Sequence, residues 1–112
     1  MSEDGLKVVK KITLDSHQKS TAWGRLMSDG SLEFELYDRD YMGGERADIY
    51  HMKPEHVDSF VARLSPLYVA KDIAVGADWF ESMPLLFSSW YEFIPWFREQ
   101  GIQFTHLVDM MP

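Results

Sequence analysis

The spacing of apolar side chains changes near the middle of this 112-residue chain. Up to about residue 52 they recur at every second position, which is the period of a β-strand, and from Pro54 to Gln100 they recur at helical spacing. Elements that are segregated in this way favour an α+β fold with a mostly antiparallel sheet. We therefore predict one α+β domain over residues 1–112, with about four or five strands and about three helices covering one face of the sheet.

A hairpin is predicted where residues 22–27 and 31–38 flank Ser28-Asp29-Gly30. The Asp-Gly pair is expected to supply the positive φ angles of a tight turn. In the second arm of the hairpin, apolar residues alternate with residues that suit a face toward water. The first group is Leu32, Phe34 and Leu36, and the second is Glu33, Glu35 and Tyr37. One face of the sheet should therefore pack on helices while the other meets water. Further strands are predicted over residues 6–14, over residues 47–52 and after residue 101.

The first predicted helix starts at Pro54, since proline suits the first turn. Its apolar stripe comprises Val57, Phe60, Val61 and Leu64. This helix is expected to end at Ser65-Pro66, because the residue before a proline avoids helical geometry. Residues 67–76 fit a strand, a coil or a weak helix equally well, and their structure is left open.

Two more helices are predicted further along the chain. Asp78 is expected to cap a short helix, and Ser89 with Glu92 has the spacing of a capping box. The second of these helices is expected to reach Gln100, with Gly101 in the left-handed conformation behind it. Pro95 predicts either a bend in this helix or a later start.

The charge of the chain limits its partners. Eleven Lys and Arg against 18 Asp and Glu give a formal net charge of −7, which repels phosphates and anionic lipids. Apolar runs are far shorter than the roughly 20 residues of a membrane span, and the acidic N-terminus is unlike a secretory signal. With no cysteine, disulfides and thiolate chemistry are excluded. We expect a cytoplasmic protein that binds neither membranes nor nucleic acid.

No catalytic or cofactor-binding motif occurs. The sequence contains no phosphate-binding glycine loop, no GxSxG elbow and no dinucleotide fingerprint. Its four histidines lack the short spacing of metal ligands. We therefore expect no catalytic residue, cofactor or metal, although an unusual active site stays open.

Aromatic residues are dense between Trp79 and Phe97, where eight of the chain's sixteen occur. Most of them fit a core-facing stripe, but Tyr91 and Trp96 fall off it. Exposed Tyr and Trp are enriched at protein interfaces. Together with the acidic stretch over residues 35–48, they define a predicted partner-binding set: Asp38, Asp40, Tyr41, Glu45, Tyr91 and Trp96.

Over about nine tenths of its length, the chain resembles a set of small uncharacterised bacterial proteins, some of them reminiscent of toxin-immunity proteins. The motifs that carry the resemblance are Ser28-Asp29-Gly30-Ser31-Leu32 with a following Asp38, Gly43-Gly44 before Ile49-Tyr50, Glu55-His56-Val57, and Phe93 to Phe97 followed by Gly101-Ile102-Gln103-Phe104. These are turn, cap and core positions. The resemblance implies no activity that could be transferred to particular residues.

The favoured hypothesis is a non-enzymatic binding module, of immunity or inhibitor type, whose acidic and aromatic surface meets a basic protein such as a toxin. One alternative is a small-ligand or enzymatic pocket between the sheet and the aromatic helices, near Trp79, Trp90 and His106. Nucleic-acid binding is the least favoured alternative, because it rests only on four lysines: Lys7, Lys10, Lys11 and Lys19. Self-association into a homodimer is a further alternative.

Overall fold

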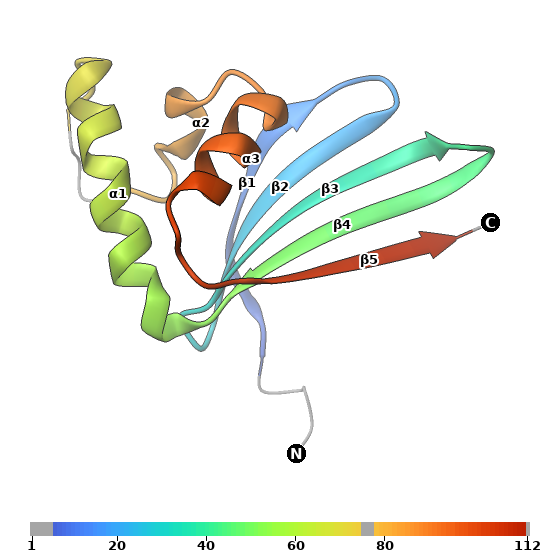
Figure 1. Cartoon of the computed structure of the whole chain (residues 1–112), viewed down its shortest axis with the longest axis horizontal. Helices are drawn as coiled ribbons and strands as arrows, with labels where there is room; N and C mark the ends of the chain where they lie inside the picture. Colours follow the sequence, from blue (N-terminus) through green and yellow to red (C-terminus); the bar gives the residue numbers. More distant parts are fainter. Residues whose placement is uncertain (1–5, 75–77, 112) are drawn as a thin grey trace.

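Five strands form one antiparallel sheet in the order of the chain (Figure 1). The computed structural model describes residues 6–74 and 78–111. The strands are β1 (Val8–Ser16), β2 (Ser20–Met27), β3 (Leu32–Tyr41), β4 (Gly44–Met52) and β5 (Thr105–Met111). The predicted α+β fold with an antiparallel sheet is confirmed.

The helices lie between β4 and β5 in the chain, and they pack on one face of the sheet. They comprise a short 3-10 turn η2 (Pro54–His56), α1 (Val57–Ala70), α2 (Met83–Leu86) and α3 (Trp90–Glu99). Figure 1 shows that they cover only the end of the sheet where β3 begins and β4 ends. The β1–β2 and β3–β4 hairpins project beyond them. Among the described residues, no helix has the length and apolarity needed to cross a membrane.

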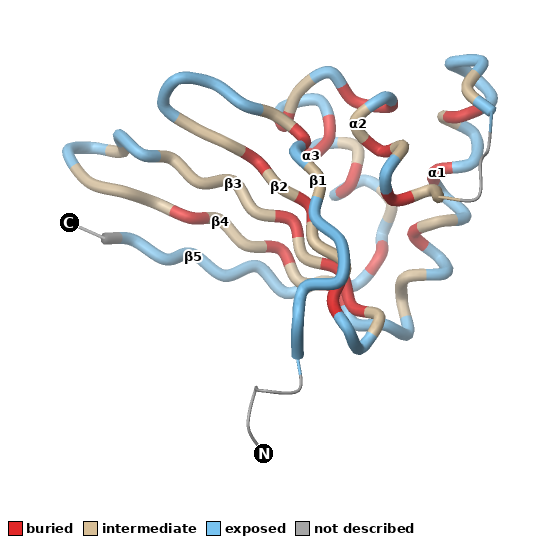
Figure 2. The backbone as a smooth tube through the Cα atoms, turned by 180° about the vertical axis from the view of Figure 1, so that it is seen from behind, coloured by how far each residue is buried: buried red, intermediate tan, exposed pale blue. Residues whose placement is uncertain are grey.

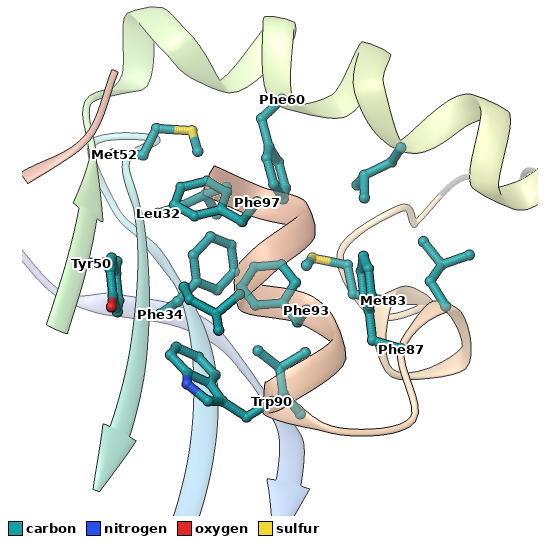
Figure 3. Close-up of a cluster of buried hydrophobic side chains, with 14 of the residues drawn as sticks. Leu32, Phe34, Tyr50, Met52, Phe60, Met83, Phe87, Trp90, Phe93 and Phe97 are labelled. Atoms are coloured by element: carbon teal, nitrogen blue, oxygen red, sulfur yellow. The ribbon is translucent and has the colours of Figure 1, made fainter. Parts of the chain in front are cut away.

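The core centres on Phe34 of β3, whose ring is fully buried. Its centroid lies 4.8 Å from that of Phe93, 5.6 Å from that of Phe60 and 5.7 Å from that of Phe97. These rings come from α1 and α3, so one strand residue joins both helices to the sheet (Figure 3). Burying a phenylalanine contributes about 2 kcal/mol, and favourable ring pairs add to this. Figure 2 shows buried segments gathered at this end, while the hairpin tips and β5 are exposed.

The β2–β3 turn forms as predicted, but its geometry differs from the prediction. Only Gly30 has a positive φ, at 89°. Asp29 instead uses its carboxylate, whose Oδ1 accepts hydrogen bonds from the backbone N–H of Ser31 at 2.9 Å and from its hydroxyl at 2.5 Å. These bonds hold the pKa of Asp29 below its usual value of 3.8. Asp29 therefore fixes this turn through its side chain and not through a left-handed backbone.

The predicted end of the first helix at Ser65-Pro66 is wrong. Helix α1 continues through Pro66 to Ala70. Proline removes one backbone hydrogen bond, but Leu64 and Tyr68 lie one turn apart on the buried face and keep the following residues helical. The helix ends where Asp72 takes a φ of 55° and the backbone N–H of Ile73 donates to the carbonyl of Tyr68. Of the segment left open, residues 75–77 lie outside the described residues.

The cap of the last helix is partly as predicted. Ser89 Oγ accepts the N–H of Glu92 at 3.2 Å, but the carboxylate of Glu92 accepts the N–H of Ser88 instead of that of Ser89. Helix α3 then runs through Pro95 to Glu99, and Gly101 has the expected positive φ of 72°. Asp78 accepts the N–H of Glu81 and so closes a turn, whereas helix α2 begins only at Met83.

The β3–β4 turn places a strained residue at the tip of the sheet. Tyr41 pairs with Gly44, and the two residues between them, Met42 and Gly43, have φ values of 51° and 83°. Positive φ at both positions is the geometry of a type I′ turn, which favours Asn-Gly. A non-glycine residue in this conformation carries a steric cost. The side chain of Met42 is 88% exposed and gains little from packing.

Replacing Met42 by Asn should therefore stabilise the protein by about 1 kcal/mol, because asparagine tolerates the left-handed conformation. Chemical denaturation monitored by circular dichroism measures the change. Met42→Ala is the matched control and should give no comparable gain, since alanine also has a Cβ but lacks the local hydrogen bonds of asparagine. Equal stabilisation by both substitutions would contradict the turn geometry.

An ion pair ties strand β1 to the segment before α2. The ammonium group of Lys10 contacts the carboxylate of Asp78, and it lies 3.9 Å from Glu81 Oε2. The hydrogen bond from Lys10 lowers the pKa of Asp78 from 3.8 to about 2. The pair should thus stabilise the fold fully above pH 3.8 and lose this contribution as the pH falls through about 2.

Lys10→Met should lower the urea midpoint at pH 7, and its deficit relative to the wild type should shrink steadily below pH 3.8 as Asp78 becomes protonated. Urea titrations at a series of pH values measure this difference. Lys53→Met serves as the control, since no ion pair joins Lys53 to another described residue. A deficit that does not depend on pH would show that Lys10 acts through packing alone.

Candidate functional site on the open face of the sheet

The face of the sheet opposite the helices is built by the alternate residues of each strand. The antiparallel register aligns Trp23 with Glu35, Arg25 with Glu33, and Glu35 with Ile49. Ile49 in turn lies opposite Leu107 of β5. No helix of the described part of the chain packs on this face (Figures 1 and 2). We call it the open face.

Trp23 and Tyr37 form the centre of the open face. Their rings are stacked, with centroids 6.3 Å apart and an interplanar angle of 24°. The ammonium group of Lys11 lies 4.6 Å from the Trp23 ring centroid, and the Arg25 guanidinium lies 6.0 Å from it. Each such cation–π contact contributes about 0.5–1 kcal/mol at an exposed site. Both aromatic residues are half-buried without any covering layer.

Charged side chains beside these rings are largely paired with each other. Arg25 binds Glu35 directly and lies 3.9 Å from Glu33 Oε1. Glu33 Oε2 also lies 3.2 Å from His51 Nδ1. The side chains of Arg25 and Glu35 are only 18% and 13% exposed, so this pair is held in place by its neighbours. A preorganised pair of this kind presents fixed charges to an incoming protein.

Glu45 is a carboxylate of the open face that has no cationic partner among the described residues. Its carboxylate disfavours ionisation of the neighbouring Tyr37 phenol and so raises the pKa of Tyr37 above its usual value of 10. Asp109 lies nearby, because it pairs with Ala47 two residues along β4 from Glu45. The hairpin end of the open face thus carries two carboxylates without an ion pair among the described residues, and the cation Arg39 also lies near Tyr37. We call Trp23, Arg25, Glu35, Tyr37 and Glu45 the Trp23 surface.

The predicted partner-binding residues do not form one patch. Asp38 and Tyr41 lie with Arg46 on the side that carries the helices, where the Arg46 guanidinium lies 5.1 Å from the Tyr41 ring. Asp40 lies near the hairpin tip and is 3.1 Å from Lys19 Nζ. Of the four predicted partner-binding residues on the β3–β4 hairpin, only Glu45 belongs to the Trp23 surface.

The two candidates on α3 have different surroundings. Tyr91 is 65% exposed. Trp96 packs against the rings of Phe60, Phe87 and Phe93, and it lines a hollow of about 170 Å³ with Leu67 and Lys71. Helix α3 lies over the sheet end remote from the β3–β4 tip (Figure 1), so neither residue joins Glu45.

The residues of the predicted ligand pocket are engaged in packing. Trp90 is buried against Tyr50, with ring centroids 5.8 Å apart. The His106 ring stacks on the Tyr50 ring, with centroids 4.2 Å apart. His106 Nε2 lies 2.9 Å from Asp48 Oδ1. Burial acts to raise the pKa of Asp48, but hydrogen bonds from Arg46 and His106 outweigh it and lower this pKa.

A second hollow, of about 100 Å³, lies near the end of β4 and is lined in part by His51, Lys53 and His56. It is well below the roughly 300–1,000 Å³ of typical small-molecule sites. Among the described residues, no three His, Cys, Asp or Glu side chains are placed to hold a metal ion.

Trp23 and Arg25 are absent from the partner-binding set predicted from the sequence. The alternation in β3 already placed Glu33, Glu35 and Tyr37 on the face toward water. The turn at residues 28–31 fixes the register of the hairpin, and extending this register would have put Trp23 opposite Glu35. This register signal is present in the sequence, but the aromatic density of residues 79–97 is the stronger pattern and favoured the helices.

No family model, no curated protein and no solved structure matches this chain. The resemblance to small bacterial proteins therefore stays a prediction.

The contact between Glu45 and Tyr37 can be checked directly. Glu45→Gln should lower the pKa of Tyr37 toward 10, because the carboxylate that disfavours the phenolate is gone. Carbon NMR of labelled tyrosine, titrated from pH 8 upward, measures this shift. Glu99→Gln, which removes the same charge from an exposed position on α3, should leave Tyr37 unchanged. An unaltered Tyr37 titration in Glu45→Gln would refute the pairing.

Proposed function

We propose that this protein is a binding module that docks a basic protein partner on the Trp23 surface. The observation that carries the proposal is the stacked pair of Trp23 and Tyr37 on a sheet face that no described helix covers. Trp, Tyr and Arg are the residue types that dominate binding energy at protein interfaces. An aromatic pair flanked by ordered charges has the anatomy of such an interface.

The charge of the surface supports a basic partner. Glu45 and Asp109 carry no ion pair among the described residues, whereas the cation Arg25 is already bound to Glu35. A cationic group of the partner therefore gains most at the hairpin end. The net charge of −7 adds long-range attraction, which raises the association rate and weakens with salt.

An inhibitor or immunity protein is the specific form of this proposal. Such a protein needs a rigid surface and fast association with a positively charged target. The five-stranded sheet supplies rigidity, because each residue of the Trp23 surface lies on a strand paired on both sides. No observation on the described residues favours a catalytic role over this one.

Trp23→Ser should weaken partner binding on the order of 30-fold, which is the effect of losing one hot-spot residue. The partner is recovered from source cells at low salt, identified as a basic protein, purified, and titrated by calorimetry. Tyr91→Ser removes an exposed aromatic residue from α3 and should bind as the wild type does.

Glu45→Gln provides a second measurement that leaves the aromatic pair in place. It should lower the association rate and flatten the salt dependence of binding, whereas Glu99→Gln should change both less because it lies outside the Trp23 surface. If circular dichroism shows that Trp23→Ser is folded and the partner binds it as tightly as the wild type, the Trp23 surface is excluded as the docking site.

A further inference from the structure

The two edges of the sheet differ in how they are protected. An edge strand presents unpaired backbone N–H and C=O groups and can pair with another strand unless it is blocked. Edge strand β1 contains Lys10 and Lys11, and Lys7 directly precedes it. Its register with β2 shifts twice, between Val8 and Lys10 and between Thr13 and Asp15. Lysines and bulges are the features that keep an edge from pairing.

Edge strand β5 has none of these features. Its residues Thr105–Met111 contain neither lysine nor proline, and its register with β4 runs from His51↔Thr105 to Glu45↔Met111 without a shift. Three large apolar residues of the strand are exposed, namely Leu107, Val108 and Met110. Figure 1 shows β5 extending past the helices with no described element along its outer edge. A long, apolar, unprotected edge is expected to be covered in solution.

We infer that β5 is the interface of a homodimer, in which two copies of this strand pair antiparallel across a two-fold axis. Because the β1 edge is blocked, the edge of a second copy that is available to pair with β5 is its own β5. Pairing of like edges closes the assembly at two copies, whereas pairing of β5 with β1 would build an open filament. The result is one continuous sheet made from two five-stranded sheets.

The side chains of β5 complement themselves in one register. A two-fold axis perpendicular to the sheet keeps each face continuous, so a residue can only meet one on the same face. With the axis at Leu107, the two Leu107 side chains meet on the open face, and Thr105 lies opposite Asp109 of the second copy. His106 then faces Val108 on the other side. Shifting the axis to Asp109 would oppose two carboxylates, and shifting it to Val108 would oppose Leu107 and Asp109.

The helices leave room for this pairing. They cover the end of the sheet where β5 begins and leave uncovered the end where β5 finishes (Figure 1). Antiparallel pairing therefore places the helix-bearing end of each copy beside the helix-free end of the other. The interface lies outside the Trp23 surface and shares only Asp109 with the hairpin end, so a partner held by Trp23, Tyr37 and Glu45 can bind the dimer.

The absence of cysteine from the chain gives a sharp test of the register. Leu107→Cys places one thiol on the proposed axis, where directly opposed residues have Cα atoms about 4.5–5.5 Å apart, within the range that a disulfide spans. Mild oxidation at dilute protein concentration should convert most of the variant into a covalent dimer. Val9→Cys is the matched control, because Val9 is an exposed apolar residue (58%) on the other edge, comparable to Leu107 (56%), and it should remain monomeric on the same timescale.

Sedimentation equilibrium of the unmodified chain measures the assembly itself. The expected mass is twice the 13.1 kDa of the chain, and Leu107→Lys should shift the dissociation constant at least tenfold toward monomer by opposing two ammonium groups. Val9→Lys should leave it unchanged. A wild-type chain that stays monomeric at millimolar concentration, or a dimer that Leu107→Lys does not weaken, would overturn the inference.

Salt separates this interface from the proposed docking of a basic partner. Two copies of net charge −7 repel each other, so added salt should strengthen the dimer, whereas it should weaken binding to a basic protein. Trp23→Ser should weaken partner binding about 30-fold without changing the dimer mass. Leu107→Lys should weaken the dimer at least about tenfold without changing partner binding. Failure of one proposal is therefore visible independently of the other.

Discussion

The packing of Phe34 against Phe60, Phe93 and Phe97 is the contact on which the rest of the molecule depends. It joins both longer helices to a single strand position, and it does so near one end of the sheet. Because α1 and α3 are 14 and 10 residues long, they cannot reach the hairpin tips from that anchor. The uncovered hairpins and the exposed course of β5 therefore follow from where the aromatic core lies.

This placement divides the sheet into a half that serves stability and a half that is available for contacts. Under the helices, the helix-facing residues Leu32 and Phe34 of β3 and Tyr50 and Met52 of β4 are fully or almost fully buried. Beyond them, polar networks replace the core: Arg39 donates to the carbonyls of His17 and Gln18 and to Thr21 Oγ1, joining the two hairpin tips. Such networks keep an uncovered sheet ordered without apolar burial, and rigidity of this kind reduces the entropy that binding would otherwise cost.

The fold could be predicted because its signals are local. Alternation along Leu32–Tyr41, the turn at Gly30 and the cap at Ser89 each depend on a few neighbouring residues. The end of α1 could not, since the burial of Tyr68 overrides the local effect of Pro66. The candidate site was harder to predict than the fold. Tyr91 and Trp96 were predicted to be exposed because they fall off the apolar stripe of the helix. Exposure also depends on which elements pack beside a residue, and Trp96 lies among Phe60, Phe87 and Phe93.

The position of β5 in the chain has a consequence for synthesis. Strands β2, β3 and β4 each pair with the strand before them through a short turn, so each can pair as soon as it leaves the ribosome. The outer edge of β4 must wait for its neighbour, because β5 is made last and the helical segment separates the two. During that interval β4 is the edge strand of the nascent sheet, and a chain truncated before residue 105 would keep this edge unpaired. Only when β5 has been made does β4 gain its second neighbour, and the exposed edge of the sheet then passes from β4 to β5.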